Sequence, residues 1–141
     1  MNLMSMYDLI KKENIDLMNF NLANAKARII QFPDDTYTIV LNESKIENSL
    51  EEKEILAEEL GHYYCNALYP IFSSAEVIRK AELRAQKWAY SVLVPLEKLL
   101  IKIKENLSLY ELADYFEVEP EYMKNCIDFY ESKYGILERS I

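Results

Sequence analysis

One segment of the chain combines its only histidine with two glutamates at a spacing suited to metal chemistry. Glu58 and His62 are four residues apart, and Glu59 follows Glu58 directly. Because residues four apart lie on one face of a helix, Glu58 and His62 can converge on one point while Glu59 projects beside them. A site in which a metal activates water needs this arrangement, with two ligands on one helical turn and a neighbouring carboxylate as base.

A third ligand has to come from another element, and Glu82 in the following helical segment is the candidate. It interrupts a helical stripe that otherwise holds Ile78, Ala85 and Ala89. Since burying an unpaired anion is unfavourable, this carboxylate needs a cation, a protonated histidine or a metal. The small alanines, together with Gly61 in a helix interior, predict that the two helices approach closely beside the site.

Each of these residues also has a simpler interpretation. Paired glutamates on an acidic helix are more often part of a solvated surface. Glu82 can pair with Arg79 or Lys80 on the surface, or with His62 in a buried ion pair without metal. Cys65, three residues after His62, is a conceivable extra ligand, although a buried inert thiol is more frequent.

The elements that must position these residues can be expected from helical and strand periods. Residues 4–20 have a rough helical pattern, which predicts one or two short helices. Residues 27–32 and 36–41 are rich in β-branched and aromatic side chains on either side of Pro33, and predict an antiparallel hairpin. Serine followed three residues later by glutamate predicts three helix starts, at Ser49/Glu52, Ser73/Glu76 and Ser108/Glu111. The expected helices are residues 50–68, 74–94, 96–104, 109–116, and 120 to just before Gly135.

Composition restricts the class of protein. With 141 residues, half of them apolar, we expect one domain, with a core of about residues 1–105 and a helical extension of about 106–141. The 24 acidic and 16 basic residues give a net charge of -8, which opposes nucleic-acid binding. No apolar run approaches the ~20 residues that span a bilayer, and the N-terminus lacks a signal-peptide pattern, so we expect a cytoplasmic protein with reduced thiols and no membrane partner.

Two segments, residues 58–63 and 82–95, resemble the ImmA/IrrE family of metallopeptidases, small zincin-like proteins common on phages and mobile elements. In that family a His-Glu-x-x-His helix precedes a Glu-x-x-Ala-x-x-Phe/Trp-Ala helix that ends in a Leu-Leu/Val-x-Pro segment. The second motif is matched at Glu82, Ala85, Trp88, Ala89, Leu93 and Pro95. The resemblance spans roughly residues 25–135. It implies an α+β, mostly helical fold, with a zincin-like core of a small antiparallel sheet packed on an active-site helix and a second ligand helix, plus C-terminal helices.

The resemblance also implies roles for individual residues. His62 and Glu82 would be metal ligands and Glu59 the catalytic base of a zinc-dependent endopeptidase, whose protein substrate would be a helix-turn-helix repressor of a phage or mobile element. Glu58 stands where the family has its first ligand histidine. Its carboxylate could replace the imidazole, and two anionic ligands would make Mn²⁺ or another divalent ion more competitive with Zn²⁺. The alternative is a catalytically degenerate protein that keeps the fold and binds a regulatory partner.

Two further classes remain open at this point. Residues 108–129 have the rhythm of a helix-turn-helix, but the second helix is acidic, so no direct nucleic-acid binding is expected. Aromatic side chains of the two C-terminal helices, at positions 115, 116, 122, 129, 130 and 134, could dock a protein, although aromatics at helical spacing are more often core. A purely structural acidic helical protein ranks last, and the sequence leaves the oligomeric state open.

Overall fold

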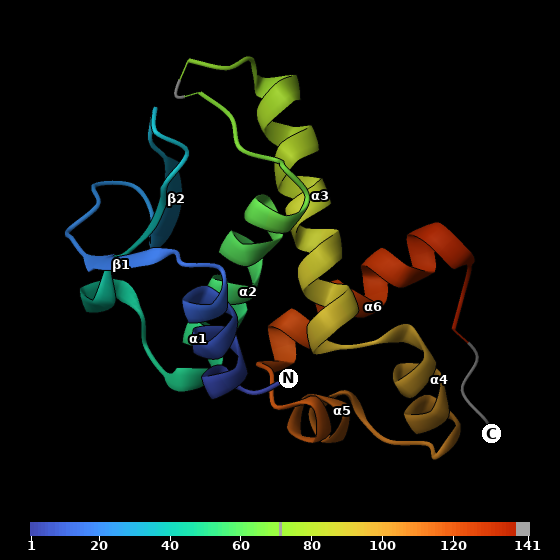
Figure 1. The fold of residues 1–141 in the computed structure, drawn as a ribbon. Coiled ribbons are helices and arrows are strands. Elements are labelled where there is room, and N and C mark those ends of the chain that lie inside the picture. The colour runs from blue at the N-terminus through green and yellow to red at the C-terminus, as the bar shows by residue number, and fades with distance from the viewer. Residues whose placement is uncertain (71, 138–141) are drawn as a thin grey trace. The chain divides into compact units, whose positions relative to one another are not determined.

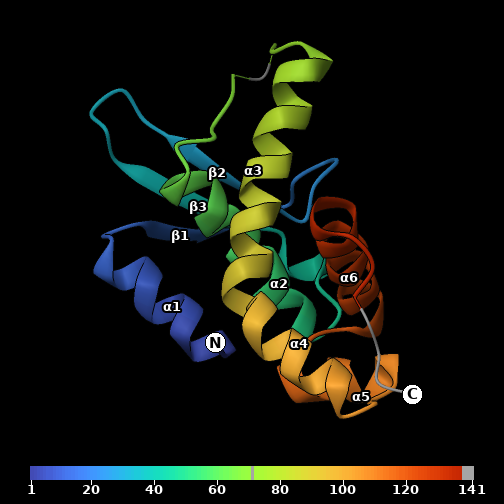
Figure 2. The same cartoon turned by 90° about the vertical axis from the view of Figure 1, so that its right-hand side faces the viewer.

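The computed structural model describes residues 1–70 and 72–137, in which six α-helices accompany three strands and one 3-10 turn (Figures 1 and 2). The α+β, mostly helical fold class is confirmed. None of the helices in these residues is long and apolar enough to cross a bilayer. In chain order the elements are α1 (Leu3–Lys12), β1 (Asp16–Asn19), β2 (Ala27–Gln31), β3 (Tyr37–Leu41), the turn η1 (Glu43–Lys45), α2 (Ser49–Tyr64), α3 (Ala75–Leu93), α4 (Leu96–Lys104), α5 (Leu109–Phe116) and α6 (Pro120–Tyr134).

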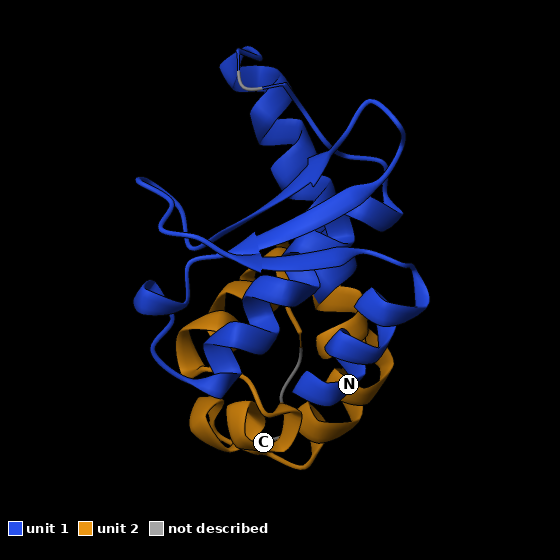
Figure 3. Ribbon diagram, turned by 60° about the vertical axis from the view of Figure 1, so that its left-hand side comes forward, with its two compact units in different colours: residues 1–89 blue, residues 90–141 orange. Residues whose placement is uncertain are grey.

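The chain forms two compact units, residues 1–89 and 90–141, which Figure 3 distinguishes by colour. The first unit holds the sheet, α1, α2 and most of α3. The second holds the end of α3 and the three C-terminal helices. The expectation of one domain with a core to about residue 105 stays a prediction.

The sheet has the order β1-β3-β2, which places β2 at one edge. β2 and β3 pair antiparallel, from Ala27 opposite Leu41 to Gln31 opposite Tyr37, so the predicted hairpin is confirmed. The turn between them is held by Asp34, whose carboxylate accepts hydrogen bonds from the amide and hydroxyl of the residue two positions on.

The small sheet is mixed rather than antiparallel, because residues 16–19, in a segment expected to hold one or two short helices, form strand β1. α1 ends at Lys12, and Asn14 adopts a left-handed φ of 57°, which stops the helix. The chain then forms β1, which pairs parallel to β3 with Asp16 opposite Thr38. Residues after Asn14 therefore take their conformation from hydrogen bonds to β3, a long-range partner that overrides the local helical pattern.

Two predicted helix caps lie one residue from the observed ones. Asn48 has an extended conformation and caps α2, because its side-chain oxygen accepts a hydrogen bond from the amide of Glu51 at 2.9 Å. Ser49 is therefore the first helical residue. At α3 the cap is Ser74 and not Ser73, because the Ser74 hydroxyl accepts a hydrogen bond from a backbone amide of the first helical turn at 3.2 Å. An asparagine or serine one position earlier or later satisfies the same amides, so the sequence motif alone does not choose between them.

The second unit follows its predicted boundaries closely. Ser108 and Glu111 form the expected capping box at the start of α5. Pro120 begins α6, which ends at Tyr134. Leucine, isoleucine and methionine side chains of α4, α5 and α6 form the buried core of this unit, including Leu99, Ile103, Leu112, Met123 and Ile127.

Helix α2 is buried over most of its length, because it packs against the sheet on one side and against α3 on another. Leu56, Ala57 and Leu60 are fully buried. A Cβ built on Gly61 would collide with the backbone carbonyl oxygen of Ala85 in α3 and would lie 3.0 Å from its Cα. The predicted close approach of the two helices is therefore present, and only glycine fits at the contact.

This contact predicts an inverted response to a Gly→Ala change. In most helix interiors alanine is the more stable residue, but Gly61→Ala should lower the free energy of unfolding by about 1–3 kcal/mol because backbone cannot move aside as a side chain can. Urea denaturation followed by circular dichroism would measure it. Asp8→Ala, at an exposed position of α1, is the matched control and should be neutral or stabilising. A Gly61→Ala protein as stable as the parent would contradict the close contact.

Candidate metal centre

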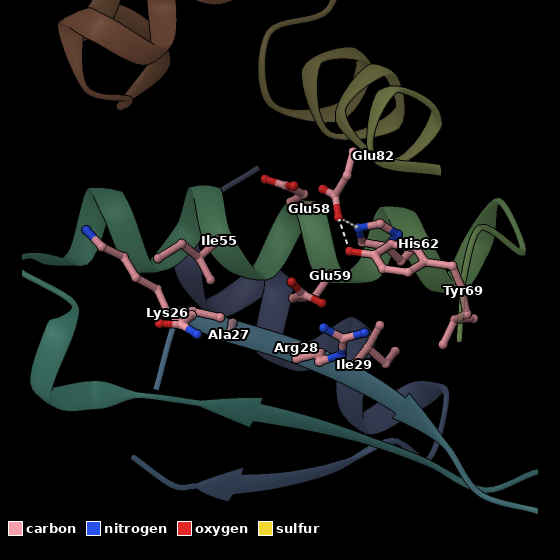
Figure 4. A pocket seen from close by; sticks show the side chains of 13 residues that line it. Lys26, Ala27, Arg28, Ile29, Ile55, Glu58, Glu59, His62, Tyr69 and Glu82 are labelled. Carbon is pink, nitrogen blue, oxygen red and sulfur yellow. Dashed lines mark hydrogen bonds and ion pairs between the residues drawn. The ribbon is translucent and has the colours of Figure 1, made fainter. Parts of the chain in front are cut away.

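Three side chains from two helices meet at one point in the first unit (Figure 4). Glu58 and His62 come from adjacent turns of α2, and Glu82 comes from α3. Each offers one ligand atom, and these atoms lie within 4.8 Å of one another. The structure thus brings together the three residues that the sequence predicted as metal ligands. A divalent cation placed between them would be within reach of all three side chains.

The His62 ring is oriented by the segment that follows α2. Asn66, at a left-handed φ of 50°, ends the helix at Tyr64, before the predicted end at Leu68. The amide of Ala67 then returns to the carbonyl oxygen of His62 at 2.8 Å. The carbonyl of Ala67 in turn accepts a hydrogen bond from His62 Nδ1, also at 2.8 Å. A carbonyl can only accept, so Nδ1 carries the proton and Nε2 points toward the carboxylates with its ligating position.

Glu82 is held from two directions. Its Oε1 lies 3.4 Å from His62 Nε2 and accepts a hydrogen bond from the hydroxyl of Tyr69 at 2.7 Å. The surface partner considered from the sequence, Lys80, instead pairs with Glu76 at 3.3 Å. The carboxylate on the apolar stripe therefore faces the histidine, and its orientation is fixed by a neighbour outside the ligand set.

Crowded carboxylates shift one another's protonation. Burial, reinforced by the nearby Glu82 carboxylate, raises the pKa of Glu58 above its usual range. The hydrogen bond from His62 holds the pKa of Glu82 below its usual range despite partial burial. Burial opposes the charged form of His62, but the Glu82 carboxylate prevails and raises the pKa of His62 to about 9. Without a metal, a neutral Glu58 and a positively charged His62 reduce the repulsion between the carboxylates.

Glu59 lies beside the cluster and points toward β2 (Figure 4). It is 9% exposed, and burial raises its pKa to about 7, an effect that His62 and a backbone hydrogen bond from Ile29 partly offset. A general base works best when its pKa is near the working pH, so this position suits proton transfer.

A cleft of about 340 Å³ opens beside the cluster. Its walls come from α2, α3, the segment after α2, and edge strand β2 with the residues before it (Figure 4). The side chains that line it include Glu58, Glu59, His62, Tyr69, Glu82 and Arg28. Glu59 and all three candidate metal ligands therefore line one cleft.

The residues present fit a divalent cation. With Nδ1 bound to the Ala67 carbonyl, Nε2 faces the carboxylates and would bind a metal after losing its proton. Two carboxylates crowd the same point, where a dication would relieve their repulsion. Cys65 is not part of the group, since its thiol faces the carbonyl oxygen of Arg84 at 3.8 Å. The candidate ligand set is therefore one nitrogen and two carboxylate oxygens.

Comparison with known proteins identifies the family. A family model for peptidase M78, described as the IrrE N-terminal-like domain, matches residues 10–127. The chain belongs to this family. The ImmA/IrrE resemblance is thereby confirmed, and membership gives the chain a metallopeptidase-like character consistent with its possible metal-binding group. No match was found among curated proteins.

Two residues of this M78 family member bear on the site but did not stand out in the sequence. Tyr69 lies in the irregular segment between α2 and α3, where no periodicity marks its direction, yet it fixes Glu82 and its ring lies 6.0 Å from that of His62. Arg28 occupies β2, and its guanidinium lies over the Tyr69 ring, 5.3 Å from the centroid. The return of the chain after Asn66 reveals Tyr69, and the placement of the hairpin against α2 reveals Arg28.

The raised pKa values predict how the stability of chelator-treated protein depends on pH. Glu58, Glu59 and His62 bind their protons more tightly in the folded protein than in the unfolded chain. Their contribution to the free energy of unfolding is therefore complete below their ordinary pKa values, which are 4.5 for the carboxyls and 6.5 for the imidazole. It is lost as pH rises through the folded-state values, about 7 for Glu59 and about 9 for His62. The lowered pKa of Glu82 acts in the opposite sense, below the ordinary carboxyl value of 4.5.

We therefore expect the Tm of metal-free protein to fall as the pH rises from about 4.5 to about 9, as differential scanning calorimetry would measure. Glu59→Gln removes one titrating group and should flatten the lower part of this decline. A Tm that rises over this range in the presence of chelator would contradict the assignment of the raised pKa values.

Proposed function

We propose that this M78 family member is a metal-dependent endopeptidase that cleaves a repressor-type protein of a phage or mobile element in the cytoplasm. The observation that carries the proposal is the convergence of Glu58, His62 and Glu82, with Glu59 beside them, on one cleft. A carboxylate base adjacent to a three-residue ligand set is what metal-assisted peptide hydrolysis requires.

Each residue at the site has a distinct task in this reaction. When bound, a divalent cation supplies Lewis-acid chemistry, lowering the pKa of a water molecule and polarising a peptide carbonyl. Glu59 takes a proton from the attacking water and later gives it to the leaving amine. The Tyr69 hydroxyl keeps the Glu82 carboxylate turned toward His62. Strand β2, at the edge of the sheet, offers backbone groups to an extended substrate that would add as a further strand.

The ion preference follows from Glu58. Two carboxylates and one imidazole neutralise a dication more fully than two imidazoles and one carboxylate would. Oxygen-rich sites are less selective for Zn²⁺ than nitrogen-rich ones, so Mn²⁺ competes more effectively here. We infer Zn²⁺ as the family ion, with Mn²⁺ or another hard divalent ion as its competitor in this chain.

Restoring a histidine tests this preference. Glu58→His should raise the affinity for Zn²⁺ over Mn²⁺ by on the order of tenfold, because an imidazole nitrogen replaces a carboxylate oxygen. Isothermal titration calorimetry with each ion would measure both affinities. Glu82→Ala, which removes a donor, should weaken both ions, and Glu76→Ala, on the exposed first turn of α3, should change neither. If Glu58→His binds Zn²⁺ and Mn²⁺ each with the same affinity as the parent, Glu58 is not a metal ligand.

A second candidate function is a non-hydrolytic regulator that binds a protein partner. Glu58 in the first ligand position favours it, because two anionic ligands leave water less acidic. The second unit adds aromatic surface, with Tyr115 and Tyr134 half or more exposed, whereas Phe116 and Tyr130 are core residues. The two functions differ in whether the bound partner is cut.

Replacement of Glu59 distinguishes the peptidase from the non-hydrolytic regulator. Glu59→Gln should keep its metal, since Glu59 is not in the ligand set, while cleavage should fall at least about 100-fold. The assay mixes the metal-loaded protein with a helix-turn-helix repressor encoded next to it and detects fragments by mass spectrometry. Equal cleavage by parent and variant would assign the base to another group. A repressor that is bound but left intact by the parent would favour the regulator.

A further inference from the structure

The cleft carries opposite charges on its two sides. Glu58, Glu59 and Glu82 make the α2 and α3 side acidic, whereas Lys26 and Arg28 lie on the β2 side. Both side chains line the same cleft, Arg28 from β2 and Lys26 from the residue just before that strand. A substrate lying along β2 therefore meets a cationic wall on one side and the acidic cluster on the other.

The two cations are not equivalent. Lys26 Nζ is engaged by Glu51 Oε2 at 2.9 Å, near the start of α2 and away from the metal cluster. Among the described residues Arg28 forms no ion pair; its guanidinium lies over the ring of Tyr69 and acts on the Glu59 carboxylate only at longer range, where it opposes the rise in the pKa of Glu59 that burial causes. Arg28 thus brings a positive charge to the cleft that no carboxylate of the described chain neutralises by direct contact.

Arg28 is also held in place. Its guanidinium lies over the Tyr69 ring, and the Tyr69 hydroxyl is hydrogen-bonded to Glu82, so the cation sits at a defined position beside the metal cluster (Figure 4). Contact with an aromatic face leaves the N–H groups of a guanidinium able to donate elsewhere. A fixed arginine loses little conformational entropy when it binds a ligand.

We propose that Arg28 is a specificity-determining residue that selects an acidic side chain, aspartate or glutamate, in the peptide bound along β2. The inference rests on the proposed peptidase function, because it assumes that a peptide occupies the cleft. Main-chain groups of an added strand pair with the backbone of β2, while alternate side chains turn toward the cleft. The fork of N–H donors on a guanidinium matches a carboxylate in two parallel hydrogen bonds, and a lysine or arginine side chain at the same position is repelled.

Binding measured without turnover tests this selection. The protein is Glu59→Gln loaded with Zn²⁺, and the probes are short fluorescent peptides in which one glutamate, or one glutamine as its neutral match, is moved through each position. Fluorescence anisotropy should show one position at which glutamate binds about tenfold more tightly than glutamine, as expected for a charge-assisted hydrogen bond. Adding Arg28→Gln should abolish that difference, and adding Arg28→Glu should transfer the preference to lysine peptides.

Lys26→Gln is the matched control, because it removes a second cation that lines the same cleft and should leave the glutamate preference intact. Equal binding of glutamate and glutamine peptides at every position would overturn the proposal, as would a preference that survives Arg28→Gln. If Arg28→Gln unfolds, Arg28→Lys can be used instead, because lysine keeps the positive charge but lacks the paired N–H donors of the guanidinium. This variant should reduce the preference for glutamate peptides. A parent that binds acidic peptides selectively but cleaves none refutes the peptidase function alone, whereas cleavage without acidic preference refutes only the role of Arg28.

Discussion

The contact between the backbones of Gly61 and Ala85 is the constraint on which the site depends. It sets the separation of α2 and α3, and with it the distance from His62 to Glu82. Helices that carry ordinary side chains at their contact lie 8–10 Å apart axis to axis, roughly, and would hold their ligands farther from each other. A glycine opposite an alanine removes the intervening atoms, so carboxylates from both helices reach one imidazole.

The short distance between α2 and α3 also brings like charges close together. Glu58 and Glu82 converge in a half-buried place, where like charges repel strongly and solvation is reduced. Protons relieve the repulsion when no metal is present, as the raised pKa values of Glu58 and His62 express. A dication relieves it more completely. The helix contact that brings the carboxylates together therefore also assembles the candidate metal-binding group.

The hairpin completes the site from the opposite side. By lying along α2, edge strand β2 closes the cleft and brings Arg28 to the face of Tyr69. The same strand covers Glu59, whose raised pKa results mainly from burial. The sheet is thus more than a support, since it contributes to the raised pKa of Glu59 and brings the positive charge of Arg28 to the far wall.

The sequence by itself determined the elements whose information is local. Helical spacing placed Glu58 and His62 on one face, the capping box and prolines fixed the C-terminal helices, and β-branched runs gave the hairpin. Tertiary structure alone decided what depends on distant partners. β1 forms because β3 offers it hydrogen bonds, and Tyr69 reaches Glu82 because the chain folds back after Asn66. Such partners are far apart in sequence, and no periodicity records the direction in which an irregular segment turns.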